Sequence, residues 1–198
     1  MAAKKPTGRR VDGWKAKSWY KIYSPENVGK VYLGDTVADD PEKIIGRVMN
    51  VPLSELVNDY TKQNVKMKFA VTDVAGDSAY TSFIGHELAR DFIRSLVKRR
   101  TSRIDCVVNF VTKDGSKVRA TVTCFTLIRA DQSQQHEIRK ILTQDVLAFG
   151  TENELGVFVN NIINGDLAKE LFKKVKELHP VRRVEVIKTK VEFAKTSA

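Results

Sequence analysis

The sequence predicts an α+β fold made of many short, mainly antiparallel strands and about four helices. Apolar residues alternate with polar ones over 104–126, as in half-buried strands, and recur at helical spacing over 134–178. The 198 residues suffice for about one domain with a real core. We expect a basic, flexible arm at 1–18, because it has little apolar surface, followed by a single globular domain at 19–198.

Short strands dominate the first part of the globular region. Alternation and turn residues predict strands at 20–23, 30–33, 45–53 and 65–84, the last being a hairpin that turns at Gly76. Trp19 is expected to fill the core at the start of the first strand, with stacking on unpaired bases as the alternative. Trp14 is assigned to neither role.

The segment 86–128 is expected to organise the fold as a basic amphipathic helix over 87–100 that leads directly into a β-hairpin. The apolar stripe of this helix comprises Leu88, Phe92, Ile93, Leu96 and Val97. Its cationic face comprises Arg90, Arg94 and Lys98, extended by Arg99, Arg100 and Arg103. A solvated helix face with cations near its C-terminus is the ordinary structural interpretation. Binding to a polyanion is the functional one.

The hairpin register depends on the turn at Asp114-Gly115. A two-residue loop would mix apolar and polar residues on both faces, whereas a three-residue loop with Gly115 in the left-handed conformation places both apolar sets on one face. We therefore predict the three-residue loop. It places Cys106 and Cys124 near each other on the buried face, and we expect reduced thiols rather than a disulfide.

Helical spacing and end signals predict three helices after the hairpin. The first covers 134–149 and is expected to end at Gly150, and a capping box at 151–154 opens the second, which closes at Asn164-Gly165. Asp166 is expected to cap the third, and Pro180 to end it. Its inward residues are Leu167, Leu171, Val175 and Leu178. A final strand over 184–193 should return to the sheet.

The charge balance points to a polyanionic partner. The net charge is +10, from 34 basic and 24 acidic residues, which favours nucleic acid first and an anionic membrane surface second. No apolar run reaches the length of a membrane span, and the first residues have no signal-peptide core, so we expect a cytoplasmic protein. The candidate RNA-binding residues are Lys4, Lys5, Arg9, Arg10, Lys15, Lys17, Arg90, Arg94, Lys98, Arg99, Arg100, Arg103, Arg139, Lys140, Arg182 and Arg183.

The residues do not indicate catalysis. His86, His136 and His179 have no second histidine or cysteine at ligand spacing, so neither a metal site nor a cofactor is expected. The two cysteines lie on an apolar face, which disfavours a reactive thiolate. Phosphate-loop, dinucleotide and nucleophile-elbow motifs do not occur in the sequence. We therefore predict a binding protein without a small-molecule substrate.

Five segments, in order, resemble a known family. They are Lys17-Ser-Trp-Tyr20, the segment 45–56, Leu96-Val-Lys-Arg-Arg100, the segment 135–141 and His179-Pro-Val-Arg-Arg-Val184. The chain is similar to the S-three-A-e family of small-ribosomal-subunit proteins, also called eukaryotic-type S-one, of archaea and eukaryotes. Eukaryotic members have a longer C-terminal tail, so the resemblance is to an archaeal-type member.

The resemblance implies a structural, ribosome-bound protein that supports subunit assembly and translation. Its partners would be small-subunit ribosomal RNA and neighbouring ribosomal proteins of the platform, near the 3′ end of that RNA and the messenger exit. It also implies an antiparallel β-barrel-like core with flanking helices. Two other functions remain open: a basic adaptor for acidic protein partners or anionic lipid, and a metal-dependent nuclease or RNA-modifying enzyme.

Overall fold

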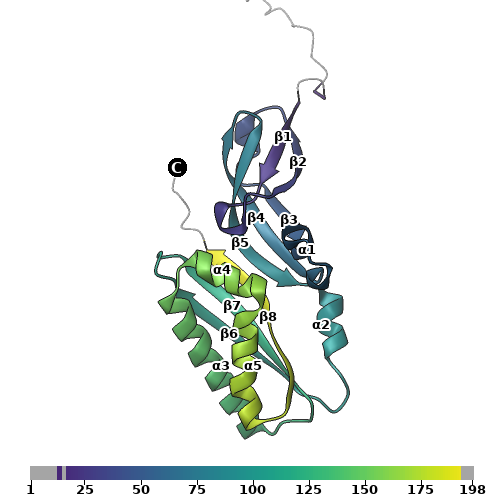
Figure 1. The fold of residues 1–198 in the computed structure, drawn as a ribbon, viewed down its shortest axis with the longest axis vertical. Coiled ribbons are helices and arrows are strands. Elements are labelled where there is room, and N and C mark those ends of the chain that lie inside the picture. The colour runs from purple at the N-terminus through teal and green to yellow at the C-terminus, as the bar shows by residue number, and fades with distance from the viewer. Residues whose placement is uncertain (1–12, 15–16, 193–198) are drawn as a thin grey trace, which may run out of the picture. The chain divides into compact units, whose positions relative to one another are not determined.

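A computed structural model describes residues 13–14 and 17–192 (Figure 1). The chain divides into two compact units. The first unit comprises the described residues up to Val48 together with Ala70–Ser82, and the second comprises Met49–Phe69 and the described residues from Phe83 onward. Strands β4 and β5 contribute residues to both units.

The described residues form eight strands, five α-helices and three short 3₁₀ helices. The strands are β1 (Ser18–Tyr23), β2 (Tyr32–Ala38), β3 (Val48–Pro52), β4 (Val65–Ala75), β5 (Ser78–Leu88), β6 (Arg103–Val111), β7 (Lys117–Thr126) and β8 (Val181–Glu192). The helices are α1 (Leu53–Val57), α2 (Arg90–Leu96), α3 (Gln132–Glu152), α4 (Leu155–Asn164) and α5 (Asp166–Leu178), with η1 (Glu26–Val28), η2 (Pro41–Lys43) and η3 (Tyr60–Lys62) between them.

The predicted α+β class is confirmed, but the barrel-like core is wrong. The strands pair in the order β2-β1-β5-β8-β7-β6, while β4 pairs with β5 and β3 with β4. Among the described residues, β2 and β6 end this path without pairing with each other, so the sheet stays open. A barrel requires its first and last strands to hydrogen-bond.

In the first unit, β1 lies between β2 and β5. It pairs antiparallel with β2 and parallel with the start of β5. Tyr20 and Ile22 are buried, and the alternation of side chains along a strand therefore directs Trp19 outward. Trp19 is 63% exposed, so its expected place in the core is wrong, and Trp14 is exposed as well.

In the second unit, one face of the sheet formed by β6, β7 and β8 is covered by α3, α4 and α5 (Figure 1). The strands contribute alternating apolar residues to this face, in the register that pairs Ile104 with Cys124 and Cys106 with Val122. The helices bury Ile138, Leu142, Val146, Phe158, Leu167, Leu171 and Val175 against it. These buried side chains form the main core of the unit.

The predicted hairpin turn is confirmed. The amide of Thr112 donates to the carbonyl of Ser116 at 3.0 Å, which leaves a three-residue loop, and Gly115 has φ of +75°. Cys106 and Cys124 are both buried free thiols. Burial raises the pKa of Cys124 to about 12, so this thiol stays protonated and unreactive.

The predicted helix over 87–100 is much shorter in the structure. Glu87 and Leu88 belong to β5, because β5 extends to pair with β8, and α2 covers only Arg90–Leu96. Residues 97–102 form a loop in which Arg100 adopts the left-handed conformation with φ of +61°. Val97, expected in the apolar stripe, is exposed, whereas Leu88 and Leu96 are buried.

Gly150 does not end a helix, as the sequence predicted, but lies inside α3. A Cβ atom at this position would lie 2.3 Å from the ring of Phe110, so the glycine serves close packing. Thr151 consequently belongs to α3, and the expected capping box does not form there. Asp166 was expected to cap α5, but it is the first helical residue and Gly165 is the N-cap. Leu178 was expected to face inward, but it is exposed.

Other helix and strand boundaries also differ from those predicted from the sequence. The expected strands at 30–33 and 45–53 are β2, which begins at Tyr32, and β3, which spans Val48–Pro52. The helix expected to close at Asn164-Gly165 does so, since Gly165 has φ of +76°, and the final strand is present as β8.

Candidate nucleic-acid interface

Three segments far apart in the sequence meet at one end of the β6-β7-β8 sheet. The amide of Ser102 donates to Oγ1 of Thr126 at 2.8 Å, and the amide of Thr126 donates to the carbonyl of Ser102 at 3.0 Å. The amide of Leu127 donates to the carbonyl of Pro180 at 3.0 Å. The loop after α2, the loop after β7 and the start of β8 are thereby held side by side.

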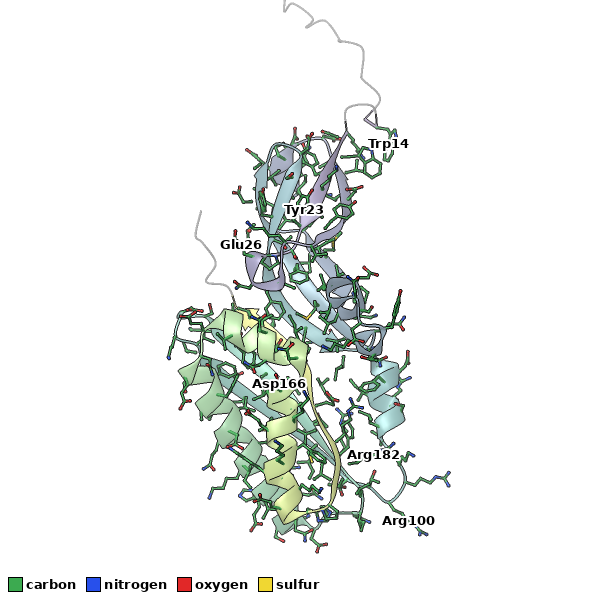
Figure 2. The ribbon with its side chains drawn as sticks, in the orientation of Figure 1. Trp14, Tyr23, Glu26, Arg100, Asp166 and Arg182 are labelled. Carbon is green, nitrogen blue, oxygen red and sulfur yellow. The ribbon has the colours of Figure 1, made fainter. Side chains whose placement is uncertain are left out.

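These segments bring seven exposed cations to the same end of the second unit. We call this group the cationic end; it comprises Lys98, Arg99, Arg100, Arg103, Arg129, Arg182 and Arg183. The register places Arg103 opposite Phe125, and Phe125 opposite Arg183. Figure 2 shows Arg100 and Arg182 projecting from this end. Six of the seven were predicted from the sequence.

Arg129 is the member that sequence reasoning missed. It lies in the loop after β7, outside the predicted basic helix and apart from the adjacent arginines Arg99-Arg100 and Arg182-Arg183. Its place becomes clear only through its neighbour Ala130, whose amide donates to Oγ of Ser102 at 3.1 Å. A basic residue directly after the hairpin was the one signal available in the sequence.

Two of the seven cations have acidic partners. Nε of Arg103 lies 3.0 Å from Oδ1 of Asp105, and Arg183 pairs with Glu185 while its guanidinium lies 5.3 Å from the ring centre of Phe92. Burial raises the pKa of Glu185, and Arg183 opposes that shift. Within the part of the chain that the structure describes, the other five form no ion pair, so their charge is available to an anion.

Apolar side chains are exposed beside these arginines. Leu127 is 55% exposed and Ile128 is 62% exposed. The backbone of Ile128 is held by His179, whose Nε2 lies 3.2 Å from the Ile128 carbonyl oxygen. The cationic end therefore offers both positive charge and aliphatic surface. RNA presents phosphates together with riboses and base faces, which suit these two kinds of group.

The remaining predicted residues belong to other places. Arg90 and Arg94 are exposed on α2, whose Phe92 contacts Arg183. Arg139 and Lys140 are exposed on α3, about two turns after its start. Lys17 is exposed in the first unit. The predicted contacts Lys4, Lys5, Arg9, Arg10 and Lys15 lie outside the described residues.

A second group of cations lies on the sheet face that α3, α4 and α5 do not cover. Arg119 pairs in register with Lys190, and Thr121 with Lys188, so the basic residues of β7 and β8 are neighbours across the strands. Lys117 lies at the start of β7 and is also exposed. From the sequence, the basic residues of β7 and β8 were expected only to be the polar, solvent-facing residues of alternating strands.

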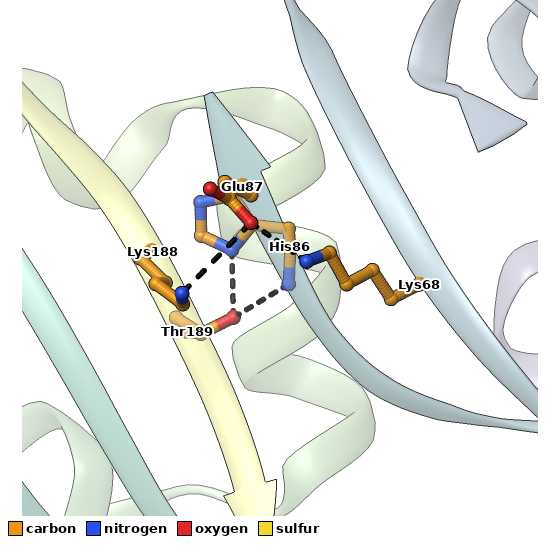
Figure 3. A network of polar contacts seen from close by, with 5 residues as sticks. All are labelled: Lys68, His86, Glu87, Lys188 and Thr189. Carbon is orange, nitrogen blue, oxygen red and sulfur yellow. Dashed lines mark hydrogen bonds and ion pairs between the residues drawn. The ribbon is translucent and has the colours of Figure 1, made fainter. Parts of the chain in front are cut away.

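Figure 3 shows how the two faces differ where β5 meets β8. Glu87 lies 2.6 Å from Nζ of Lys68 and 3.9 Å from Nζ of Lys188. The hydrogen bond from Lys68 lowers the pKa of Glu87 despite partial burial. The adjacent His86 is buried instead, and its two ring nitrogens contact Oγ1 of Thr189 at 2.7 Å and the carbonyl oxygen of Val186 at 2.9 Å.

Burial lowers the pKa of His86 to about 4, so the ring is neutral and structural at pH 7. No group of three or more His, Cys, Asp or Glu side chains placed to hold a metal ion occurs among residues 13–14 and 17–192. Over those residues, none of the helices is both long and apolar enough to cross a membrane.

Comparisons with known proteins agree on one family. The model of the ribosomal S3Ae family matches residues 5–195. "Small ribosomal subunit protein eS1" of Methanospirillum hungatei is 90% identical over 198 residues, covering 100% of both chains. The proteins of the same name from Methanoregula boonei and Methanoculleus marisnigri are 54% and 50% identical over 192 residues, covering 97% of this chain and 96% and 98% of theirs.

Proposed function

The chain belongs to the ribosomal S3Ae family, and we propose that it is a structural constituent of the small ribosomal subunit that binds ribosomal RNA through its cationic end. The family is a class of ribosomal structural proteins rather than enzymes, in agreement with the function predicted from the sequence. The observation that supports the RNA contact is the gathering of seven exposed cations at the ends of three strands.

The physical basis of the proposed contact is neutralisation of phosphates. Lysine and arginine side chains that bind phosphates release the counterions condensed on the RNA, and this release favours binding at low salt. Guanidinium groups also bind phosphate oxygens through two parallel hydrogen bonds. Such contacts fix the position of a protein on folded RNA and carry little sequence information.

The rigidity of the cationic end should help this contact. Arg103, Arg182 and Arg183 lie on strands whose other face is packed against the helices, so their backbone is held before RNA arrives. A preorganised site loses less conformational entropy on binding. Leu127 and Ile128 would then pack against riboses or unpaired bases beside the bound phosphates.

The other predicted cations would extend the contact. We assign the basic residues of 1–18, together with Arg90, Arg94, Arg139 and Lys140, to further phosphates of the same RNA. The family resemblance supports a position on the platform of the subunit, near the messenger exit and beside other ribosomal proteins. The adaptor function is the alternative, and binding that persists after nuclease treatment would favour it.

Binding of the full chain to a fragment of small-subunit ribosomal RNA at several salt concentrations tests the proposal. Each lost phosphate contact reduces the slope of log K against log salt by roughly 0.7–0.9. Arg99→Ala, Arg100→Ala and Arg182→Ala together should therefore reduce the slope by about 2.

The matched control removes three exposed lysines outside the cationic end, Lys66→Ala, Lys113→Ala and Lys176→Ala, which also lowers the net charge by three. It should change the slope much less. Equal slopes for the two triple variants would show that overall charge, and not the cationic end, determines binding. An affinity that does not depend on salt would contradict the proposal outright.

A further inference from the structure

A groove in the second unit is lined by residues of α1, η3, α2 and β8, among other elements. Its volume is about 820 Å³. One wall comes from α1, η3 and the start of β4, and the other from the junction of α4 and α5 and the first turns of α5. Its apolar lining includes Leu53, Val65, Phe92, Ile162, Phe172 and Val184.

We propose that this groove binds an extended segment of a neighbouring protein, one that carries carboxylates beside bulky apolar side chains. This interaction goes beyond RNA binding and rests on the proposed place of the chain in the small subunit; Arg183 belongs both to the groove and to the cationic end. The volume falls within the range of about 300–1,000 Å³ that is typical of sites enclosing a ligand. A groove of this size accommodates several side chains of a peptide.

The charges of the groove define the acidic part of the partner. Four cations and one acid line it: Lys62, Lys169, Lys173, Arg183 and Glu185. Lys169 pairs with Asp166 at 2.8 Å, and Arg183 pairs with Glu185. Lys62, on η3 near the Asp59 carboxylate, and Lys173, on α5, form no ion pair with a described residue. A carboxylate in the groove can therefore pair with the lysine of η3 or with the lysine of α5.

The apolar surface favours a protein segment over RNA. Phe92 and Phe172 are half-buried and leave aromatic surface inside the groove. Leu127 and Ile128 at the cationic end are exposed and can meet riboses or unpaired bases, whereas the half-buried rings of the groove lie out of reach of an RNA helix, which keeps its bases paired and would leave these rings in contact with water. A peptide with an apolar side chain between carboxylates covers the aromatic rings and neutralises the lysines together, as aromatic pockets do at the centres of protein interfaces.

Photocrosslinking within assembled small subunits tests this inference. The variant Phe172→p-benzoylphenylalanine places a photoreactive ketone in the groove and conserves an aromatic side chain. After assembly, purification of subunits and irradiation, digestion with nuclease and protease releases the crosslinked fragment for mass spectrometry. The expected product is a peptide of another ribosomal protein with Asp or Glu close to a bulky apolar residue.

The control carries the same photoreactive group at Leu147, a half-buried residue of α3 outside the groove. Crosslinks at Phe172 to RNA, only to this chain itself, to a peptide without acids, or at the yield of the Leu147 control would each overturn the proposal. The amount of each variant found in purified subunits measures assembly on the RNA, independently of the crosslink. Failure of both variants to enter subunits would therefore count against the RNA-binding proposal, whereas normal incorporation without the expected crosslink would count against the groove proposal.

Charge reversal provides the second measurement. Lys62→Glu together with Lys173→Glu, added to the photoreactive variant, should lower the crosslink yield about tenfold, because a tenfold loss of affinity corresponds to only about 1.4 kcal/mol. Lys113→Glu with Lys176→Glu reverses two exposed charges outside the groove and should leave the yield unchanged. Equal yields from the two double variants would contradict the assignment of an acidic partner.

Discussion

The covered face and the cationic end use the same three strands in opposite ways. On the covered face, β6, β7 and β8 contribute apolar side chains to the core, and the neighbouring His86 on β5 is neutral and fully hydrogen-bonded. At the cationic end, the same strands and their loops carry seven exposed cations and the exposed Leu127 and Ile128. The first region provides stability, and the second is available for binding.

The difference follows from the energetics of burial. An apolar side chain gains free energy when helices cover it, whereas a buried charge loses hydration that few partners replace. The covered face therefore excludes charge, and the cationic end keeps its charge in water. We expect substitutions on the covered face to change stability with little change in the RNA contact, and the reverse at the cationic end.

The largest expected effect is a loss of stability from Phe158→Ala. Phe158 is fully buried, and its ring lies 5.3 Å from that of Phe110 and 6.2 Å from that of Phe149, measured between ring centres. Truncation leaves a cavity, which should lower the free energy of unfolding by about 3–5 kcal/mol. Denaturant unfolding measures this, with the exposed Leu127→Ala as the control. Similar losses in both variants would remove the distinction between the two regions.

An intermediate effect is expected from pH, through His86. Its pKa is about 4 in the folded protein and near 6.5 when unfolded, so the unfolded state binds more protons between these values. Stability should therefore fall as the pH is lowered from 6.5 to 4, by roughly 3 kcal/mol at most. Comparison with His86→Gln isolates this residue from other groups. The pH profile of the variant should be flatter over that window.

The raised pKa of Glu185 acts in the other direction, because the folded protein binds the proton more readily and gains relative stability on acidification. This contribution is common to the wild-type chain and to His86→Gln, so it cancels in the comparison. Parallel pH profiles for the two proteins would mean that His86 titrates normally and is not sealed in the core.

The smallest expected effect on stability is at the cationic end. Arg99→Ala, Arg100→Ala and Arg182→Ala remove exposed side chains without ion pairs to described residues, so each should change the free energy of unfolding by less than about 0.5 kcal/mol. Denaturant unfolding of the triple variant measures the sum. A large loss of stability would show that these arginines support the fold, and reduced RNA binding in that variant would then have a structural cause.

Sequence reasoning was most successful where short-range patterns decide the structure. The alternation over β6 and β7 determined both the buried face and the register, because a shift of one residue would expose the whole apolar set. It was wrong where a distant contact prevailed. Glycine often follows the last turn of a helix, and Gly150 was therefore predicted to end one. The ring of Phe110 instead leaves room only for glycine at this position inside α3.

The candidate site was predicted in part for the same reason. Arg99, Arg100, Arg182 and Arg183 stand out as local runs of charge. Arg129 and the lysines of β7 and β8 do not, because their relevance depends on which strand lies beside them. Trp19 was wrongly placed in the core, because it shares a strand face with the exposed Lys21 while Tyr20 and Ile22 face inward.

The sequence by itself determined the α+β class, the hairpin and the strongly basic character that indicates a polyanionic partner. Each of these depends on composition or on neighbours along the chain. Only the tertiary structure decided that the sheet is open, that α2 is short and that three segments far apart in the sequence form one cationic end. These features depend on hydrogen bonds and packing between segments far apart in the chain, which no local pattern encodes.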